Sequence, residues 1–441
     1  MIDFIKAYLP GPLKSYLKIL KRNTFDRISG RLKINRVRLR HAYLVDELAQ
    51  RKRIKVVFLA VHKSVWKVDA LYQIMAADPF FEPEVLVCPY TSFGHERMRE
   101  ELEKTYEYFK TKGYSVEKSI KDDGQIVRLR DLDPDIVVFT NPHNLTLKEY
   151  YQDAYSRYLS IYVPYYYMAT NHVGDAQEEL DTLMLNSMWR IYWPHKYIFD
   201  KFSVVSRIQG RNSKLTGYPA TEMLLKCDLP AEGDVWKMQI NKKKKIIYAP
   251  HHSISDDNSS LSTFLRLGMV MKQLAEQYAD FVQWSFKPHP ILKAKLYLHP
   301  DWGKERTDEY YEFWSNQAHT QLDEGEYEYL FMHSDAIIHD CSSFIVEYAV
   351  TGKPGLYLKN GTRSDMDFLN DFGKCVFERY RTANSEAEIS DFILDLVRDK
   401  SFHENSDSSC FNRYLSEFYD EELPSEKIIK DIKSALTKSY H

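Results

Sequence analysis

Three loops in the second half of the chain carry histidines at positions suited to phosphate chemistry. They are His251-His252, Lys287-Pro288-His289 and His339-Asp340, and each follows a short apolar run. Alternation of such runs with helical stretches predicts parallel strands joined by helices. In a doubly wound sheet the loops that follow the strands open on one edge, where ligands bind. We therefore expect the three loops to converge on one site.

The segment after Asp340 predicts the start of a helix. Ser342 and Ser343 stand at its expected first turn, and unpaired N–H groups at a helix start favour phosphate. Glu347 lies about one turn further on, where it is placed to accept hydrogen bonds from a ribose. Gly352-Lys353-Pro354 then ends the helix. This pattern is typical of the nucleotide-diphosphate half of a two-domain transferase, although an ordinary strand–turn–helix unit with a serine N-cap has the same signature.

Length and composition place the chain among two-domain α/β proteins. Its 441 residues exceed what one hydrophobic core usually organises, and a net charge of −3 argues against a dedicated nucleic-acid binder. Five cysteines are scattered and odd in number, which favours a reducing compartment. We find no apolar run long enough to span a bilayer and no signal-peptide pattern. We therefore expect the protein in the cytoplasm or on the cytoplasmic face of the inner membrane.

The first 40 residues are strongly basic. They hold eleven Lys and Arg residues but only Asp3 and Asp26 as acidic residues. The stretch Pro12–Arg22 has the pattern of a basic amphipathic helix, which suits anionic lipid headgroups. A solvated helix packed on the first domain is the alternative. Residues 1–40 thus predict a peripheral contact with an anionic membrane surface.

Two successive alternations of strand and helix define the expected domains. We assign residues 1–50 to the basic amphipathic segment, 51–210 and 211–385 to two Rossmann-like domains facing a cleft, and 386–441 to C-terminal helices. The expected strands cover residues 54–61, 84–88, 135–140, 158–163, 190–199 and 203–206 in the first domain, and 246–249, 281–286, 336–338 and 355–358 in the second.

The order and spacing of these motifs resemble the CDP-glycerol glycerophosphotransferase family, the teichoic acid and capsule-polymer type of enzyme. The resemblance covers roughly residues 200–360. It implies the two-domain glycosyltransferase B architecture, with the acceptor on the first domain and the nucleotide donor on the second. The motifs that carry it are Gly217-Tyr-Pro219, Tyr248-Ala-Pro-His251, Lys287-Pro-His289-Pro290 and Ser334-Asp335 through Asp340-Cys-Ser342-Ser343 to Glu347 and Gly352-Lys-Pro354.

The first half departs from the family pattern. Teichoic acid polymerases carry a His-Gly-Thr-Pro motif whose histidine is thought to act as the base. After the expected strand at 158–163, this chain has Pro164-Tyr165-Tyr-Tyr167 and then Asn171-His172 instead. It therefore resembles a sub-branch that lacks the motif. Acceptor-side candidates are His62, at the end of the first expected strand, together with Tyr165 and His172.

The resemblance implies a transferase that moves a polyol phosphate, glycerol phosphate first, from a CDP-linked donor. The acceptor is a cell-surface polysaccharide or a lipid-linked molecule, and CMP is released. No cofactor, metal or nucleic acid is implied. His289, held rigidly between two prolines, is the candidate to neutralise the diphosphate as an imidazolium or to protonate the departing CMP. His251 is a phosphate contact or the general base, whereas His252 is expected to be structural or exposed.

The remaining donor-side residues have supporting roles. Ser342 and Ser343 offer hydroxyl and backbone N–H donors to phosphate, and Lys287 supplies positive charge. Asp340 is expected to orient its turn or a histidine. His339 and Glu347 complete the expected nucleotide site.

Three alternatives remain open on the sequence alone. A glycosyltransferase with a nucleotide-sugar donor would use the same serines and Glu347. A metal-dependent phosphoesterase would use a metal cluster drawn from several acidic and histidine residues, but none of the histidines shows the H-x-H, H-x-D or H-E-x-x-H spacing of metal ligands. A non-catalytic nucleotide-sugar binder is disfavoured by His251 and His289. The residues available to the metal cluster are His251, His252, Asp256, Asp257, His289, His339 and Asp340.

Overall fold

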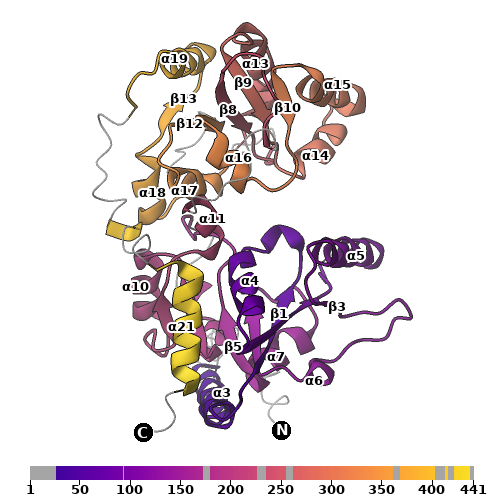
Figure 1. Ribbon diagram of the computed structural model, residues 1–441, viewed down its shortest axis with the longest axis vertical. Coiled ribbons are helices and arrows are strands. Elements are labelled where there is room, and N and C mark those ends of the chain that lie inside the picture. Colours follow the sequence, from indigo (N-terminus) through magenta and orange to yellow (C-terminus); the bar gives the residue numbers. More distant parts are fainter. Residues whose placement is uncertain are drawn as a thin grey trace, which may run out of the picture. The chain divides into compact units, whose positions relative to one another are not determined.

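The computed structural model describes residues 26–92, 94–171, 179–225, 235–254, 262–360, 368–402, 413–415 and 422–437. The described chain forms two compact units (Figure 1). Unit 1 is built from the described parts of residues 1–165, 174–217 and 424–441. Unit 2 is built from those of residues 166–173 and 218–423. Each unit is an α/β structure on a parallel sheet, which confirms the expected fold class.

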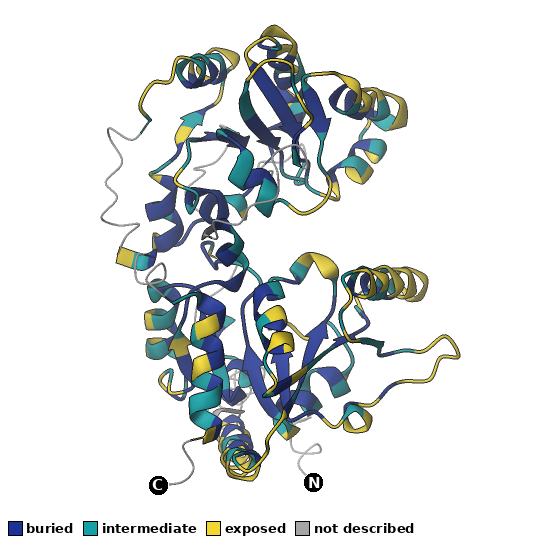
Figure 2. Ribbon diagram, viewed as in Figure 1, coloured by how far each residue is buried: buried dark blue, intermediate teal, exposed yellow. Residues whose placement is uncertain are grey.

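Within the described residues, unit 1 holds a sheet of seven parallel strands in the order β3-β2-β1-β4-β5-β6-β7. The inner strands are short, mostly apolar runs that are largely buried (Figure 2), as expected for a parallel sheet covered on both faces, whereas the two edge strands, β3 and β7, are more polar and only partly buried. They are β1 (Ile54–Ala60), β2 (Phe81–Val87), β3 (Val116–Lys118), β4 (Ile136–Phe139), β5 (Leu159–Tyr162), β6 (Arg190–Trp193) and β7 (Ser213–Leu215).

The C-terminal helix α21 (Pro424–Thr437) belongs to unit 1, although it follows unit 2 in the sequence (Figure 1). Its Ile428, Ile432 and Leu436 are buried in the core of that unit. The other helical segments of unit 1 are α3 (Asp26–Leu48), η2 (Lys63–Val65), α4 (Asp69–Ala77), α5 (His95–Thr111), α6 (Leu129–Leu132), η3 (Lys148–Tyr150), α7 (Gln152–Arg157), α9 (Leu183–Ser187) and α10 (Lys196–Val205).

Two strands expected near the end of the first domain are wrong. The expected strand at 190–199 ends at Trp193, and α10 occupies most of the rest together with the expected strand at 203–206. His195 caps this helix, because its side chain accepts a hydrogen bond from the backbone N–H of Ile198. Ile198 and Phe202, four residues apart, are buried on one face, so a helical period replaces the expected strand period.

Unit 2 holds six parallel strands within its described residues, in the order β10-β9-β8-β11-β12-β13. They are β8 (Lys244–Ala249), β9 (Val282–Phe286), β10 (Thr320–Leu322), β11 (Ala336–His339), β12 (Gly355–Leu358) and β13 (Arg381–Ala383). The helical segments are η4 (Pro219–Thr221), α11 (Glu222–Leu225), α13 (Phe264–Gln277), α14 (Leu292–Leu298), α15 (Gly303–Asn316), α16 (Glu328–His333), α17 (Phe344–Ala349), α18 (Asp371–Phe377) and α19 (Glu386–Val397). The four strands expected here are all present.

An aromatic core fixes one face of the unit 2 sheet. Phe286 on β9 stacks on Trp314 of α15 with ring centroids 5.1 Å apart, and Tyr248 on β8 stacks on Phe286 at 5.6 Å. These large rings bury much apolar surface and hold the carboxyl ends of β8 and β9 in place.

A short segment of the first half of the chain packs in unit 2. The Tyr167 hydroxyl donates to Thr221 Oγ1 at 3.0 Å, and the Asn171 N–H donates to Phe368 O at 2.7 Å. Gly373 on α18 is required here, since a Cβ atom at this position would lie 2.1 Å from the Ala169 carbonyl oxygen. Residues 166–171 are thus held by unit 2 contacts.

The amphipathic helix expected at Pro12–Arg22 lies outside the described residues. Among those described, no helix is both long enough and apolar enough to cross a membrane. Cys88 and Cys341 are buried thiols, whereas Cys375 is disulfide-bonded, which the scattered cysteines did not predict.

His41 on α3 makes the stability of unit 1 dependent on pH. Its side chain is buried, and burial lowers the pKa of His41 from 6.5 to about 4. His41 is therefore protonated near pH 6.5 in the unfolded chain but only near pH 4 in the folded chain. Stability from the neutral ring is full above pH 6.5 and is lost as pH falls toward 4.

We expect His41→Phe to flatten this dependence. Between pH 7 and pH 4 the wild type should lose up to about 3 kcal/mol more unfolding free energy than the variant. Urea unfolding at a series of pH values measures the difference, and other buried histidines cancel because both proteins share them. Parallel curves for the two proteins would contradict the assignment.

Candidate active site

The loops after three neighbouring strands of unit 2 lie side by side. β8 pairs with β9 on one side and with β11 on the other, all in parallel. Hydrogen bonds continue beyond the strand ends: the Lys287 N–H donates to Tyr248 O at 2.8 Å, and the His289 N–H donates to Pro250 O at 3.1 Å. The structure thus brings the three histidine loops to one edge of the sheet, as expected.

A buried carboxylate at the end of β11 holds two of these loops. Asp340 Oδ1 accepts the His251 N–H at 2.5 Å, while Oδ2 accepts the N–H and hydroxyl of Thr263 at 2.5 and 2.9 Å. Ser262 Oγ adds a fourth bond at 3.3 Å. Burial raises the pKa of Asp340 to about 6, and the donated hydrogen bonds oppose that rise. Asp340 therefore positions the His251 loop and the start of α13.

Three imidazoles gather above this anchor and are called here the histidine cluster: His251, His252 and His289. The ring centroids are 4.3 Å apart for 251–252, 4.1 Å for 252–289 and 5.4 Å for 251–289. One ring nitrogen from each residue lies within 4.8 Å of the other two. All three side chains are half-buried, so the cluster remains reachable from solvent.

The cluster is electrically neutral in the free protein at pH 7. Burial, followed by repulsion from neighbouring histidines, lowers the pKa of His251 to about 3 and that of His289 to about 4. Burial and the Lys295 ammonium also lower the pKa of His252. The expected imidazolium form of His289 is therefore not the form that the free protein favours. Neutral rings offer lone pairs, and they take up protons only when an anion arrives.

Hydrogen bonds fix two of the rings. His251 Nδ1 lies 2.8 Å from the Ser253 hydroxyl, and the Ile291 N–H lies 3.3 Å from His289 Nδ1. His252 Nδ1 is buried and has no hydrogen-bond partner among the described residues. His252 was expected to be structural or exposed, yet it lies between the two candidate catalytic histidines. Its adjacency to His251 in sequence was the available signal.

Lys287 does not extend toward a ligand. Its side chain is buried, and its ammonium group donates to the Gly325 carbonyl at 2.5 Å and to the Asp323 carbonyl at 3.3 Å. It thereby ties the loop after β9 to the loop after β10. The Lys287 ammonium group therefore binds backbone carbonyls of the protein itself and does not point toward a ligand.

His339 is also buried. Its Nδ1 lies 3.0 Å from the Cys341 carbonyl oxygen, and its ring packs edge-on against Tyr357 and Tyr380. Burial lowers the pKa of His339 to about 3, so the ring is neutral and Nδ1–H donates to the carbonyl. His339 shapes the turn that carries Asp340 and the serines.

The serines lie where the sequence places them, at the start of α17. Ser342 is half-buried and Ser343 is exposed. Ser343 is the N-cap residue, but its side chain makes no capping hydrogen bond. Its hydroxyl lies 3.1 Å from Cys341 Sγ. The Ser343 hydroxyl therefore does not cap the helix.

Glu347 lies on the buried side of α17. Its carboxylate accepts a hydrogen bond from the Tyr327 hydroxyl, and its side chain is 5% exposed. The expected contact with a ribose requires Tyr327 to move aside or the sugar to take its place.

Two of the acceptor-side candidates, His62 and Tyr165, lie in unit 1. His62 follows β1, and its Nε2 lies 3.0 Å from Glu101 Oε2 on α5. Its Nδ1 lies 2.7 Å from the Ser64 hydroxyl and accepts the Ser64 N–H at 3.1 Å. Tyr165 is half-buried, and His172 lies outside the described residues. Glu101 was missed from the sequence, because 39 residues separate it from its histidine.

Comparison with known proteins supplies the family. The model of the CDP-glycerol:poly(glycerophosphate) glycerophosphotransferase family matches residues 192–432, which is more than half of the chain. The chain belongs to this family. The resemblance stated from the motifs and the expected enzyme class are therefore confirmed. None of the curated proteins matches the sequence.

Solved structures agree on the fold. The wall teichoic acid polymerase TagF matches with a TM-score of 0.54 at 14% identity, over 97% of this chain and 99% of that chain. A Listeria monocytogenes protein described as a UDP-N-acetylglucosamine 2-epimerase matches with a TM-score of 0.52 at 13% identity, over 88% and 98%. Both support the glycosyltransferase B architecture for this member of the glycerophosphotransferase family.

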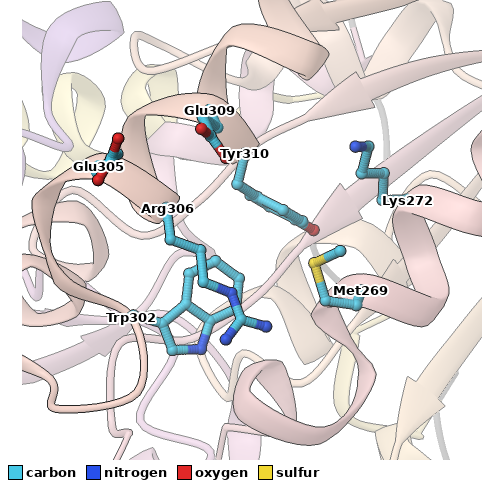
Figure 3. Close-up of a pocket in the computed structure, with 7 residues that line it drawn as sticks. All are labelled: Met269, Lys272, Trp302, Glu305, Arg306, Glu309 and Tyr310. Atoms are coloured by element: carbon cyan, nitrogen blue, oxygen red, sulfur yellow. The ribbon is translucent and has the colours of Figure 1, made fainter.

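A separate pocket of about 480 Å³ lies between α13 and α15 (Figure 3). The Arg306 guanidinium lies over the Trp302 ring at 4.6 Å and fills part of its wall. The pocket is lined by Met269, Lys272, Trp302, Glu305, Arg306, Glu309 and Tyr310. None of the motif residues lines this pocket.

We expect Asp340→Ala to destabilise unit 2 by roughly 3 kcal/mol. Removal of the carboxylate leaves three buried donors of His251 and Thr263 without an acceptor, and bonds to charged groups are among the strongest. Urea unfolding measures the loss. Asp280→Ala, at an exposed position of the same unit, is the control and should stay within about 0.5 kcal/mol of the wild type. A loss below 1 kcal/mol for Asp340→Ala would show that the carboxylate is not the anchor.

Proposed function

We propose that this protein transfers glycerol phosphate from CDP-glycerol to a cell-surface polysaccharide or lipid-linked acceptor and releases CMP. The acceptor hydroxyl oxygen forms a bond to the phosphorus that carries glycerol. The bond from that phosphorus to the oxygen shared with CMP breaks, and CMP leaves with the electron pair. The observation that carries the proposal is the gathering of His251 and His289, with ring centroids 5.4 Å apart, at the sheet edge where β11 also ends, within the region that matches the family.

The donor side must neutralise a diphosphate. Ser342, Ser343 and the first N–H groups of α17 are the donors nearest the end of β11. His289 is the candidate to contact the diphosphate, since an arriving anion raises the affinity of a neutral imidazole for a proton. A protonated ring there stabilises the charge that develops on departing CMP.

The acceptor side needs a base. His251 is our candidate, because burial keeps its ring unprotonated in the free protein, and an arriving anion raises its lowered pKa again and so strengthens it as a base. His62 of unit 1, paired with Glu101, is the second candidate. A carboxylate that orients an imidazole is the arrangement that catalytic triads use to hold their histidine base.

We expect His289→Ala and His251→Ala each to lower turnover by ~100-fold or more, the usual scale for loss of a charge stabiliser or base. The assay follows CMP release from CDP-glycerol, with mass analysis of the product. His95→Ala, an exposed histidine of unit 1, is the control and should retain wild-type turnover.

The same assay separates the alternative reaction. CDP-ribitol and nucleotide sugars are offered beside CDP-glycerol, and a glycosyltransferase would add a sugar without phosphorus. Transfer of a sugar from a UDP-linked donor, with no reaction of CDP-glycerol, would overturn the proposal. Near-full turnover in His251→Ala alone would move the base to His62.

We also propose that α3 contacts an anionic lipid surface. Leu32, Leu39 and Tyr43 are 66%, 74% and 63% exposed, and helical spacing places them within about 40° on one side of α3. The exposed cations Arg36 and Arg40 lie along one side of this apolar row. Apolar side chains beside cations on an exposed helix face fit the boundary between headgroups and acyl chains.

The protein should bind vesicles that contain anionic lipid at low salt and be released as salt rises. The double variant Leu32→Glu/Leu39→Glu should bind at least about tenfold more weakly, because it places charge in the apolar boundary. Val204→Glu, at an 84% exposed apolar position on α10, is the matched control. Co-sedimentation measures binding, and equal binding by the two variants would exclude α3 as the contact.

A further inference from the structure

The histidine cluster has features that transfer chemistry does not require. Two imidazoles would serve the proposed reaction, yet a third ring lies between them, 4.3 and 4.1 Å from its neighbours. His252 Nδ1 is buried without a hydrogen-bond partner among the described residues. An unpaired buried lone pair is costly, and a bound ligand that uses it removes that cost.

We propose that the histidine cluster binds one Zn²⁺ ion. The cluster supplies three uncharged nitrogen donors from two strand-end loops, and three histidines with one open position form a known type of zinc site. Imidazole donors favour Zn²⁺ over Mg²⁺ and Ca²⁺, which prefer oxygen.

The geometry is close to what zinc needs. Zinc–nitrogen bonds of about 2.0–2.1 Å place ligand atoms roughly 3.4 Å apart in a tetrahedron. The three nitrogens lie within 4.8 Å of one another, so small ring rotations close the site. His251 Nδ1 accepts the Ser253 N–H at 3.2 Å and lies 2.8 Å from the Ser253 hydroxyl, so these contacts hold the ring and leave Nε2 as its other nitrogen.

Some residues of the expected metal cluster are excluded. Asp340 is turned toward backbone and hydroxyl donors, and His339 is buried against Tyr357. The site therefore has no carboxylate among its described ligands. Lys295 on α14 repels a cation at all three rings, since its charge lowers each of their pKa values.

Zinc binding and transfer compete for the same lone pairs. A metal on His251 and His289 prevents the first from accepting the hydroxyl proton and the second from taking up a proton beside the diphosphate. Zinc is therefore an inhibitor of the reaction, a consequence that rests on the proposed function. The binding itself does not depend on it.

The test uses the full-length, tag-free protein and Zn²⁺ alone. Calorimetry and equilibrium dialysis with metal analysis should show one ion per chain for the wild type. His251→Ala, His252→Ala and His289→Ala should each weaken binding by at least ~100-fold, because three protein ligands are the minimum of such a site. His95→Ala should bind as the wild type does.

Lys295→Gln is a variant that should raise the affinity for zinc. It removes a repelling charge from an exposed position and should strengthen zinc binding several-fold. Co²⁺ substituted for Zn²⁺ should give the visible absorption of a tetrahedral nitrogen site, and His252→Ala should abolish that absorption. Circular dichroism and urea unfolding confirm that each variant is folded.

Failure of the wild type to bind zinc, or equal binding by the cluster variants, would overturn the zinc site and leave the transfer reaction untouched. Zinc binding by a protein that does not turn over CDP-glycerol would refute the proposed function and leave the zinc site standing. Zinc binding without inhibition would overturn the competition alone.

Discussion

The loop that carries His251 and the start of α13 both depend on one buried carboxylate. Asp340 follows β11 and receives hydrogen bonds from the loop after β8 and from the first residues of α13. These elements are far apart in sequence, and no other group among the described residues accepts from both. Burial disfavours the ionised form of Asp340, and the hydrogen bonds donated to its two oxygens offset part of that cost. The backbone position of His251 is thus fixed by this carboxylate.

The strand order then determines which side chains can meet. β8 lies between β9 and β11, so the loops that follow all three are neighbours at the carboxyl edge. Burial at that edge has two consequences. It keeps His251 and His289 neutral, and it draws Lys287 and His339 into contacts with backbone carbonyls. The free site therefore carries less positive charge than its sequence indicates, and an arriving diphosphate would change the protonation of the rings it meets.

The sequence predicted more of the fold than of the site. Runs rich in apolar residues, such as Ile54–Ala60 and Ala336–His339, predicted parallel strands, because burial on both faces of the sheet favours apolar side chains. The region of α10 was misread, since Tyr197–Phe199 is apolar enough for a strand and only the His195 cap reveals the helix. At the site, motif positions predicted which loops converge. They did not predict which way each side chain turns, so Lys287 and Glu347 were expected at the ligand and lie buried, while His252 was set aside and lies in the cluster.

The acceptor side follows a different logic. Where the family carries its His-Gly-Thr-Pro motif, this chain continues from β5 into a segment whose two ends are held by different units: Tyr165 by unit 1, and Tyr167 by unit 2 through Thr221. The Tyr167 ring also packs on Tyr218 at 4.6 Å, and both are buried. At the position where the family motif has its histidine, the tyrosines of this chain therefore pack in the protein core. A base for the acceptor hydroxyl is then expected from another element, and His251 beside Ser253 and His62 beside Glu101 are two imidazoles that hydrogen bonds already hold in place. A proton acceptor must be held in place by its neighbours before it can serve a reaction. A chain without the motif histidine therefore needs another histidine that neighbouring groups already orient.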